Sequence, residues 1–377
     1  MKKVGIMSMQ RIFNYGSFLQ AYGLKKMLES IDNDIKVTFV DYRPGEVLLK
    51  KDSKSKGIIR IIKKLKEYNS IDNTLRNKMK FFYHKKRYSK RYFPLLGISK
   101  DKNYDTNLDL LIIGSDEVFN CVQSNTNVGY SLDLFGKNSK SKTLISYAGS
   151  FGNTTIDKIN KYNIKQEIFE NFSRFDHISV RDNNSKKIIE SLGIGTPKVH
   201  VDPVLAYDFM EKEPLIPKET IYKSPYLIVY GYSGRLNKLE NNIIKEFARK
   251  KNLKILCFGG VQDCCDEFID CTPFELLAYF RDSSFIITDT FHGTIFSLIN
   301  KKKFITLIRK STGLNYGNEE KLTFLLNTFN LIGRGIYDLS EISLEKSFLE
   351  TINYDQVFEI LEQKRNDTYG YLKAVLK

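Results

Sequence analysis

The sequence predicts an α/β fold built from two Rossmann-like domains. Short apolar runs of strand length alternate with amphipathic stretches of helix length along most of the chain, a pattern typical of βαβ units with a parallel sheet. The alternation breaks once, between Leu205 and Lys223, where prolines and scattered charge favour a linker. The length of 377 residues also suits two domains at roughly 150 residues per domain.

Six strands and three helices are expected before the linker. The strands are expected at 4–7, 35–40, 110–113, 144–148, 178–180 and 199–201, and the helices at 17–28, 158–172 and 184–192. Gly193 ends the third helix, because glycine adopts the left-handed conformation that often follows a helix. These elements define an N-terminal domain over residues 1–205, with a basic helical insert at about 45–103.

The same alternation resumes after the linker. Strands are expected at 226–230, 253–258, 285–287 and 304–307, and helices at 236–250, 293–299, 319–329 and 355–372. Thr272, Pro273 and Glu275 mark another helix start, with threonine as the cap, proline in the first position and glutamate three residues after the cap. We therefore expect a C-terminal domain over 206–345 that holds the donor site, and a helix within 346–377 that can pack back on the first domain.

Composition excludes several classes of protein. A hydrophobic content of 42% with 8 Pro and 23 Gly describes a folded globular chain. No apolar run reaches the roughly 20 residues that span a bilayer, and the first residues lack a signal-peptide pattern, so we expect a cytoplasmic protein. The 5 cysteines include no Cys-x-x-Cys pair, which favours reduced, structural thiols over a metal site.

The positive charge is concentrated in the insert. Between Lys50 and Arg91 there are 16 Lys and Arg against 3 acids, so this segment carries nearly all of the net charge of +15. Within it, residues 57–66 place isoleucines and a leucine on one helical stripe beside lysines, and Phe81, Phe82 and Tyr83 follow among further cations. Two interpretations stay open: peripheral contact with the anionic inner face of a membrane, or a helix packed on the first domain with solvated lysines. Nucleic acid is not an expected partner, because no base-stacking module accompanies the charge.

Polar residues gather where three strands are followed by helices. These junctions are residues 14–17, 114–117 and 288–293. In Rossmann-like domains, ligands bind at the carboxyl ends of the strands and the amino ends of the following helices. His292 lies at such a junction and is a candidate catalytic residue, with a packed structural histidine as the alternative. His84, His177 and His200 are interpreted as structural, because none of them follows the exit of a strand.

Arg181 directly follows another apolar strand. Its guanidinium suits a carboxylate or a phosphate, and the equal alternative is an ion pair with Asp182 or with the other domain. The Asp32-Asn33-Asp34 sequence has the form of a metal-bound sugar-nucleotide site, but it lies where a helix ends and the chain turns, which favours a turn. We expect no metal site.

Five blocks of sequence together resemble the polysaccharide pyruvyl transferase family. They are residues 14–22, 114–120, 146–152, 180–182 with 202–203, and 288–294. The resemblance implies a glycosyltransferase-B-like arrangement of two Rossmann-like domains with a central cleft. It also implies transfer of a pyruvyl group from phosphoenolpyruvate to two sugar hydroxyls as a ketal, with no cofactor beyond that donor substrate.

The resemblance also implies roles for the residues at the junctions. His292, Asp289, Asp116 and Glu117 are the expected catalytic residues. The expected substrate-binding residues are Asn14, Tyr15, Gly16, Ser17, Ser115, Arg181, Gly293, Thr294 and Arg309. Characterised members often have Arg-Leu before the His-Gly pair, where this chain has Thr290-Phe291, and Arg309 and Arg334 are the nearest replacements for that arginine.

Other functions fit parts of the same pattern. A sugar-nucleotide-dependent glycosyltransferase, or another saccharide-modifying transferase, would use the same two domains, and a basic adaptor would use the Lys50 to Arg91 segment alone. The expected acceptor is a saccharide of a cell-surface polysaccharide, such as an exopolysaccharide or capsule, or its lipid-linked oligosaccharide precursor.

Overall fold

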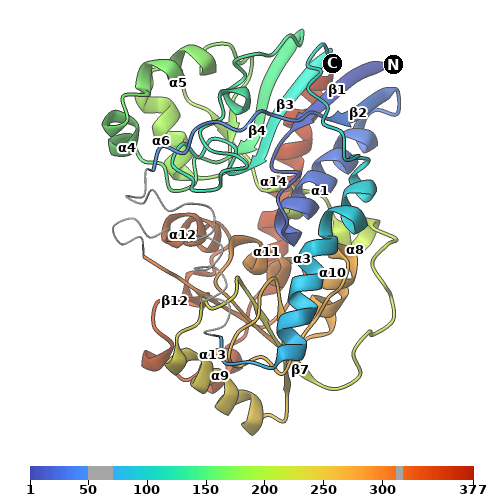
Figure 1. Ribbon diagram of the computed structural model, residues 1–377, viewed down its shortest axis with the longest axis vertical. Coiled ribbons are helices and arrows are strands. Elements are labelled where there is room, and N and C mark those ends of the chain that lie inside the picture. Colours follow the sequence, from blue (N-terminus) through green and yellow to red (C-terminus); the bar gives the residue numbers. More distant parts are fainter. Residues whose placement is uncertain (50–70, 311–316) are drawn as a thin grey trace. The chain divides into compact units, whose positions relative to one another are not determined.

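The chain forms two α/β units. The computed structural model describes residues 1–49, 71–310 and 317–377. Within these residues, unit 1 comprises 1–49, 90–208 and 358–377, and unit 2 comprises 71–89, 209–310 and 317–357 (Figure 1). Two long helices, α3 (Leu75–Leu96) and α14 (Tyr354–Leu376), contribute residues to both units.

Unit 1 is built on a parallel six-stranded sheet. The strands are β1 (Lys2–Met7), β2 (Ile35–Phe39), β3 (Leu110–Asp116), β4 (Thr143–Gly149), β5 (Ser179–Val180) and β6 (Lys198–Val199). Their order in the sheet is β2-β1-β3-β4-β5-β6. The central strands are apolar on both faces, as expected for a parallel sheet that helices cover on both sides.

Helices cover both faces of this sheet. They are α1 (Tyr15–Ile31), η1 (Leu132–Phe135), α4 (Ile156–Lys161), α5 (Lys165–Phe172), α6 (Asn183–Ser191), α7 (Pro203–Ala206) and the unit 1 part of α14. Figure 1 shows α4, α5 and α6 on one side and α1 and α14 on the other.

An aromatic cluster fills the face of the sheet covered by α5. The ring of Phe119 lies 4.8 Å from that of Phe172 and 5.5 Å from those of Phe135 and Phe151, and all four side chains are buried. A Cβ at Gly149 would come within 2.3 Å of the Phe119 ring. Glycine is therefore required at the end of β4 so that this ring can lie against the strand.

The C-terminal helix α14 packs on unit 1 through aromatic contacts. The Tyr371 hydroxyl donates a hydrogen bond to the Ser146 carbonyl at 2.8 Å, and its ring lies 4.7 Å from the His200 ring. His200 is buried and hydrogen-bonded through Nδ1 to the Ser179 hydroxyl at 2.7 Å. His200 is therefore packed and hydrogen-bonded within unit 1. These contacts agree with its interpretation as a structural histidine.

Unit 2 contains a second parallel six-stranded sheet. The strands are β7 (Tyr226–Tyr230), β8 (Lys254–Phe258), β9 (Glu267–Phe268), β10 (Phe285–Thr288), β11 (Phe304–Leu307) and β12 (Gly335–Ile336). Their order is β12-β11-β10-β7-β8-β9. The two sheets confirm the predicted α/β fold class with two Rossmann-like units.

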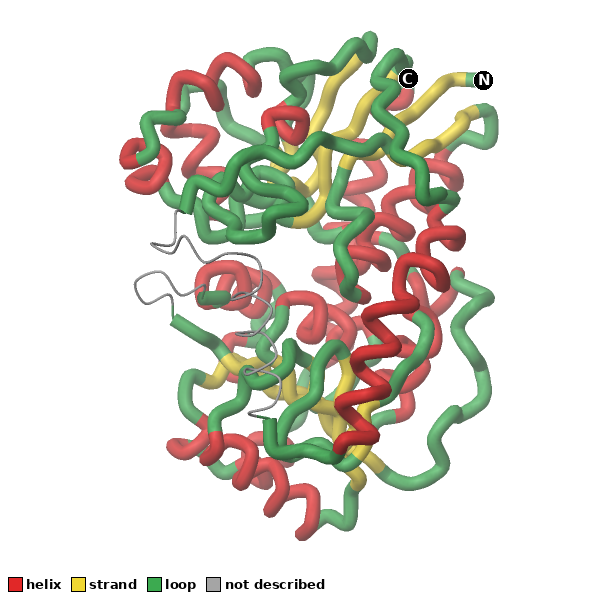
Figure 2. The backbone as a smooth tube through the Cα atoms, viewed as in Figure 1, coloured by secondary structure: helices red, strands yellow, loops and turns green. Residues whose placement is uncertain are grey.

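Helices precede and follow the strands of unit 2 along the chain, and Figure 2 shows the helices in red and the strands in yellow. They are α8 (Phe209–Lys212), α9 (Lys238–Lys250), α10 (Pro273–Asp282), α11 (Phe291–Ile299), α12 (Glu319–Thr328), η2 (Ile332–Arg334), η3 (Leu339–Glu341) and α13 (Leu344–Leu349). The predicted capping box of α10 is confirmed: Thr272 Oγ1 accepts from the Glu275 amide, and the Glu275 carboxylate accepts from the Thr272 amide.

Three predicted elements differ from the structure. The helix expected over 158–172 is divided into α4 and α5, because Asn163 adopts a left-handed conformation with φ of 53°. The helix expected from Gly293 begins two residues earlier, because Thr290 caps it. The expected linker begins within α7 and contains α8. The stripe predicted at 57–66 lies outside the described residues.

The five cysteines are buried free thiols. In the part of the chain that the structure describes, no helix meets the length and apolarity required to cross a bilayer.

The buried position of His200 predicts a pH-dependent stability. Burial lowers the pKa of His200 from 6.5 to about 4. The unfolded chain therefore binds a proton that the folded chain excludes, and stability falls as pH drops from about 6.5 to about 4. At pH 5, the free energy of unfolding should be lower by about 2 kcal/mol than at pH 7 on this account.

Urea unfolding of His200→Gln at both pH values measures this contribution, with His177→Gln as the matched control. The loss between pH 7 and pH 5 should be smaller in His200→Gln by about 2 kcal/mol and unchanged in the control. An equal loss in both variants would show that His200 is not the titrating group.

Candidate functional site

The sheet order of each unit locates its ligand-binding edge. In unit 1 the order reverses between β1 and β3, and in unit 2 it reverses between β7 and β10. Ligands of open parallel sheets bind beyond the carboxyl ends of the strands at such a switch point. The residues that follow these four strands are therefore the candidate site residues of their units.

At the switch point of unit 1, Asp116 joins β3 to helix α1. The Ser17 hydroxyl donates a hydrogen bond to Asp116 Oδ2 at 2.7 Å, and the Glu117 amide donates one to Oδ1 at 2.9 Å. Asn14 caps α1 by accepting from the Ser17 amide at 2.7 Å, and Tyr15 and Gly16 are buried in its first turn. Of these predicted substrate-binding residues, the structure brings Ser17 directly to the candidate catalytic carboxylate.

The backbone at this edge adopts uncommon conformations. Asp116 has φ of 74° and Ala148, on the neighbouring strand β4, has φ of 46°. Left-handed backbone at residues other than glycine is uncommon and tends to occur at functional sites. The hydroxyl of Ser115, the residue before Asp116, donates a hydrogen bond to the Ala148 carbonyl at 3.1 Å.

Arg181 lies at the same edge, in a buried ion pair. Its NH1 lies 2.7 Å from Asp202 Oδ2, and its NH2 lies 3.8 Å from Asp116 Oδ1. Burial alone would lower the pKa of Arg181, but Asp202, Asp116 and Asp182 raise it, so the guanidinium stays charged. The ion-pair interpretation is therefore favoured for Arg181, and its main partner is Asp202. Asp182 instead caps α6 by accepting from the Ser185 amide at 2.8 Å.

Glu117 is held at the rim of this group. Its Oε2 accepts from the Asn120 side chain at 2.9 Å, and a Cβ at Gly152 would come within 2.5 Å of the same oxygen. The glycine of the 146–152 block therefore allows the chain to pass close to this carboxylate.

At the switch point of unit 2, Asp289 follows β10 and Arg235 lies in the loop after β7. Arg235 NH1 lies 3.2 Å from Asp289 Oδ2, and its guanidinium lies over the Tyr232 ring at 5.3 Å. Burial raises the pKa of Asp289, against the lowering effects of Arg235 and Arg309. A small hollow beside this pair is lined by Gly231, Arg235, Gln262, Thr288 and Asp289, among others.

His292 lies in the first turn of α11, three residues after Asp289. Its ring is half-buried against Phe291 and Phe296, with ring centroids 5.5 and 6.1 Å apart. The Gly293 amide is bonded to the capping hydroxyl of Thr290 at 3.0 Å. Thr294 is buried and bonded to Thr290 and Thr306. Gly293 and Thr294 therefore stabilise the first turn of α11 through their hydrogen bonds with Thr290.

A Cβ at Gly293 would come within 2.1 Å of Thr288 Oγ1, so this position needs glycine for packing.

Arg309 and Arg334 have defined partners in unit 2. Arg309 forms two hydrogen bonds to the carboxylate of Glu240, at 2.6 and 3.1 Å. Arg334 is buried and donates to the carbonyls of Ser347 and Glu350, at 2.6 and 2.9 Å. Arg334 therefore anchors α13, whereas Arg309 remains near the edge of the sheet. The Asn318 side chain donates to the Asp289 carbonyl at 2.6 Å and accepts from the Arg309 amide at 2.6 Å, linking the ends of β10 and β11.

The two edges present opposite charges to solvent. In unit 1, the Arg181 side chain is 3% exposed and Asp116 is 14% exposed, so a carboxylate is the outer member. In unit 2, the side chains of Arg235 and Arg309 are 31% and 23% exposed, while their partners Asp289 and Glu240 are 3% and 4% exposed. A ligand reaching unit 1 meets carboxylates first, and one reaching unit 2 meets guanidinium groups first.

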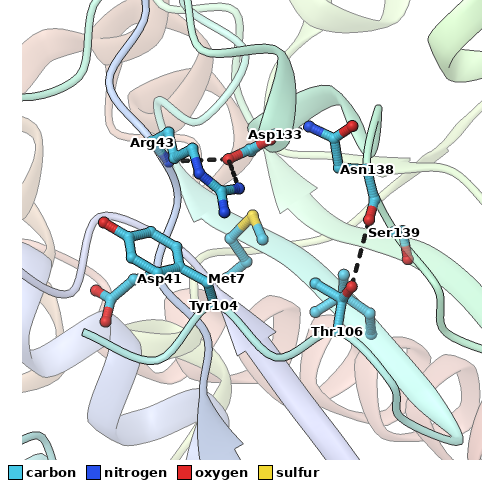
Figure 3. Close-up of a pocket in the computed structure, with 9 residues that line it drawn as sticks. Met7, Asp41, Arg43, Tyr104, Thr106, Asp133, Asn138 and Ser139 are labelled. Carbon is cyan, nitrogen blue, oxygen red and sulfur yellow. Dashed lines mark hydrogen bonds and ion pairs between the residues drawn. The ribbon is translucent and has the colours of Figure 1, made fainter. Parts of the chain in front are cut away.

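A separate pocket of unit 1 contains none of the predicted site residues (Figure 3). The Arg43 guanidinium lies 4.7 Å from the Tyr104 ring centre and 3.6 Å from Asp133 Oδ2. Asp41, on its wall, is paired with Arg11. These pairs join the loops that follow β2 and precede β3 to the rest of unit 1.

In the described ranges, no group of three or more His, Cys, Asp or Glu is positioned to hold a metal ion.

Sequence reasoning missed Arg235, Glu240, Asn318 and the pairing role of Asp202. Arg235 could have been found by the rule used for the other junctions, since Gly231 to Arg235 follows a buried strand and precedes a helix. Glu240 carries the signature of a capping box with Asn237, which gives no indication of a distant arginine.

Two parallel sheets with polar switch points define an α/β protein with one candidate ligand edge on each unit. The family model for polysaccharide pyruvyl transferase matches residues 14–311. Because this match covers most of the chain, the protein belongs to the polysaccharide pyruvyl transferase family. A search of curated protein sequences gives no match.

Several solved structures are similar at the level of the chain trace. The UDP-GlcNAc 2-epimerase from Neisseria meningitidis bound to UDP-GlcNAc has 12% identity and a TM-score of 0.49, covering 100% of this chain and 98% of its own. The S. aureus MnaA-UDP structure has 11% identity and a TM-score of 0.47, covering 99% and 91%. The E. coli heptosyltransferase WaaC has 10% identity and a TM-score of 0.35, covering 96% and 99%. At these values the likenesses do not identify a substrate.

The buried pair predicts a large stability effect at Asp202. Asp202→Ala leaves the Arg181 guanidinium buried without its nearest carboxylate, which should lower the free energy of unfolding by about 3 to 5 kcal/mol. Glu190→Ala breaks the exposed Lys186–Glu190 pair at 3.8 Å and is the matched control, with an expected change below about 1 kcal/mol. Urea unfolding measures both variants, and similar small losses in the two would contradict a structural role for the pair.

Proposed function

We propose that this protein transfers a pyruvyl group from phosphoenolpyruvate to two hydroxyls of a saccharide, forming a pyruvate ketal. Membership of the polysaccharide pyruvyl transferase family supports this activity. The outer side chains of the two sheet edges carry opposite charges, and this observation is the basis for assigning one substrate to each unit. An anionic donor and a neutral, hydroxyl-bearing acceptor need just such different surroundings.

The proposed donor site is the edge of unit 2. Phosphoenolpyruvate carries a phosphate and a carboxylate, and Arg235 and Arg309 are the outer members of their ion pairs there. Asp289 and Glu240 act as positioning residues that hold these guanidinium groups. Arg235 takes the place of the arginine that this chain lacks before His292, since it is paired with the carboxylate at the start of the same turn.

The proposed acceptor site is the edge of unit 1. Asp116 is its outer carboxylate and is oriented by the Ser17 hydroxyl and the Glu117 amide. A carboxylate in this position can accept the proton of an attacking saccharide hydroxyl. Arg181 supports Asp116 from the buried side and is therefore a positioning residue in this proposal.

The reaction balances without a further reactant. The methylene carbon of phosphoenolpyruvate gains a proton and becomes a methyl group, and the first hydroxyl oxygen bonds to the central carbon. The bond from that carbon to the phosphate oxygen breaks, and the second hydroxyl completes the ketal. Of the two hydroxyl protons, one balances the proton given to the methylene carbon and the other leaves with inorganic phosphate.

His292 is the proposed proton donor to the methylene carbon, because it lies three residues after Asp289, which is the partner of Arg235. His292→Ala should lower the rate of phosphate release from phosphoenolpyruvate by about 100-fold or more, as for loss of a positioned acid. The assay uses the full chain with a panel of soluble saccharides. The exposed-loop variant His177→Ala should keep the wild-type rate.

Thermal shifts with phosphoenolpyruvate and with sugar nucleotides separate this proposal from the glycosyltransferase alternative. Stabilisation by phosphoenolpyruvate alone supports the proposal, whereas stabilisation by a sugar nucleotide alone supports the alternative. An active His292→Ala variant that unfolds at lower temperature would make His292 structural.

A further inference from the structure

Helix α3 presents an exposed surface that combines apolar and basic side chains. Leu75, Met79 and Phe82 follow one another at helical spacing, and their exposed fractions are 73%, 46% and 57%. Tyr83 lies beside Phe82, with ring centroids 5.7 Å apart, and is also exposed. We call these four side chains the α3 apolar stripe. Large apolar side chains grouped on a surface in this way commonly mark an interaction site.

Cations flank this stripe on the same side of the helix. Between Leu75 and Leu96, α3 contains eight Lys and Arg and no Asp or Glu. Arg76, Lys86 and Arg87 are exposed beside the α3 apolar stripe, and the Arg87 guanidinium lies 5.2 Å from the centre of the Tyr83 ring. Among the residues that the structure describes, Arg76 and Lys86 have no ion-pair partner.

The opposite side of α3 is already used by unit 2. Asn77 accepts from the Phe268 amide at 3.1 Å and donates to the Asp266 carbonyl at 3.1 Å, so its side chain pairs with the edge strand β9. His84 Nδ1 lies 2.8 Å from Asp270 Oδ1, and the Phe81 ring packs on Phe268 at 5.4 Å. The helix covers the edge of the sheet with this buried side. These contacts of the buried side hold α3 in place, and they thereby also fix the orientation of its exposed side.

We propose that the exposed side of α3 docks on an anionic lipid bilayer. A surface helix with apolar side chains at its centre and cations on the flanks fits the boundary between headgroups and acyl chains, where the cations also meet anionic lipids. A purely electrostatic partner such as a nucleic acid would leave Leu75, Met79 and Phe82 without a favourable environment. Docking of α3 on a bilayer does not depend on the pyruvyl-transfer reaction.

Co-sedimentation of the full-length protein with vesicles tests the proposal. The protein should pellet with phosphatidylcholine vesicles that contain phosphatidylglycerol and stay in the supernatant with phosphatidylcholine alone. Raising the salt from roughly 0.1 to 0.5 M should release it, because screening weakens the electrostatic part.

Two double variants separate the apolar and the basic contributions. Leu75→Ser/Phe82→Ser and Lys86→Glu/Arg87→Glu should each lower the partition coefficient on anionic vesicles by about tenfold or more. The matched control is on α9, where Lys238, Leu239 and Lys245 are also exposed. Leu239→Ser and Lys238→Glu/Lys245→Glu should bind as the wild type does.

Several outcomes would overturn the proposal. The first is that the wild type fails to pellet with anionic vesicles. The second is that the α3 and α9 variants lose vesicle binding equally. The third is that only the charge variant loses vesicle binding, while Leu75→Ser/Phe82→Ser binds normally. The last result would identify a polyanion-binding surface without insertion. Because all substituted residues are exposed, melting temperatures should stay near that of the wild type. The single variants Phe82→Ser and Lys86→Glu repeat the test if a double variant does not fold.

Discussion

The Arg181–Asp202 ion pair is the interaction on which the carboxyl edge of unit 1 depends. It places a permanent positive charge beneath Asp116 while leaving the Asp116 carboxylate as the outer group. In unit 2 the buried and outer charges are reversed. Asp289 and Glu240 are buried there, and their partners Arg235 and Arg309 are the more exposed members of the ion pairs. A buried charge needs a partner at close range, so the inner member of each pair is fixed by desolvation. In the proposed function, the outer member then determines which ligand each edge favours.

Most of the fold could be predicted from the sequence, because parallel strands buried on both faces give continuous apolar runs. The capping box at Thr272 and Glu275 shows how local signals also locate helix ends. The division between α4 and α5 could not be predicted, since it depends on the left-handed conformation of Asn163, which the apolar spacing does not encode. Helix α3 was expected only as part of a basic insert, and its attachment to β9 through Asn77 involves residues about 190 positions apart.

The candidate site was predictable where a residue lies at a strand exit and unpredictable where it has a distant partner. Asp116, Asp289 and His292 belong to the first kind, and the structure places all three at the ends of switch-point strands or in the following helix turn. The pairing of Arg181 with Asp202 and that of Arg309 with Glu240 belong to the second kind. Sequence alone left Arg181 equally suited to an anionic ligand or to an ion pair, because a guanidinium serves both purposes. Only the position of the nearest carboxylate distinguishes them.

Binding of the anionic donor at the edge of unit 2 can be measured by calorimetric titration with phosphoenolpyruvate. Arg235→Gln removes one of the two outer charges of unit 2 and should weaken binding by at least about tenfold. Asp116→Asn removes the outer charge of unit 1 and should leave the affinity unchanged or slightly higher. Asp116→Asn keeps the shape of the side chain and Arg235→Gln shortens it, and melting temperatures check that each variant folds. Unchanged affinity in Arg235→Gln together with loss of binding in Asp116→Asn would contradict the assignment of the two edges.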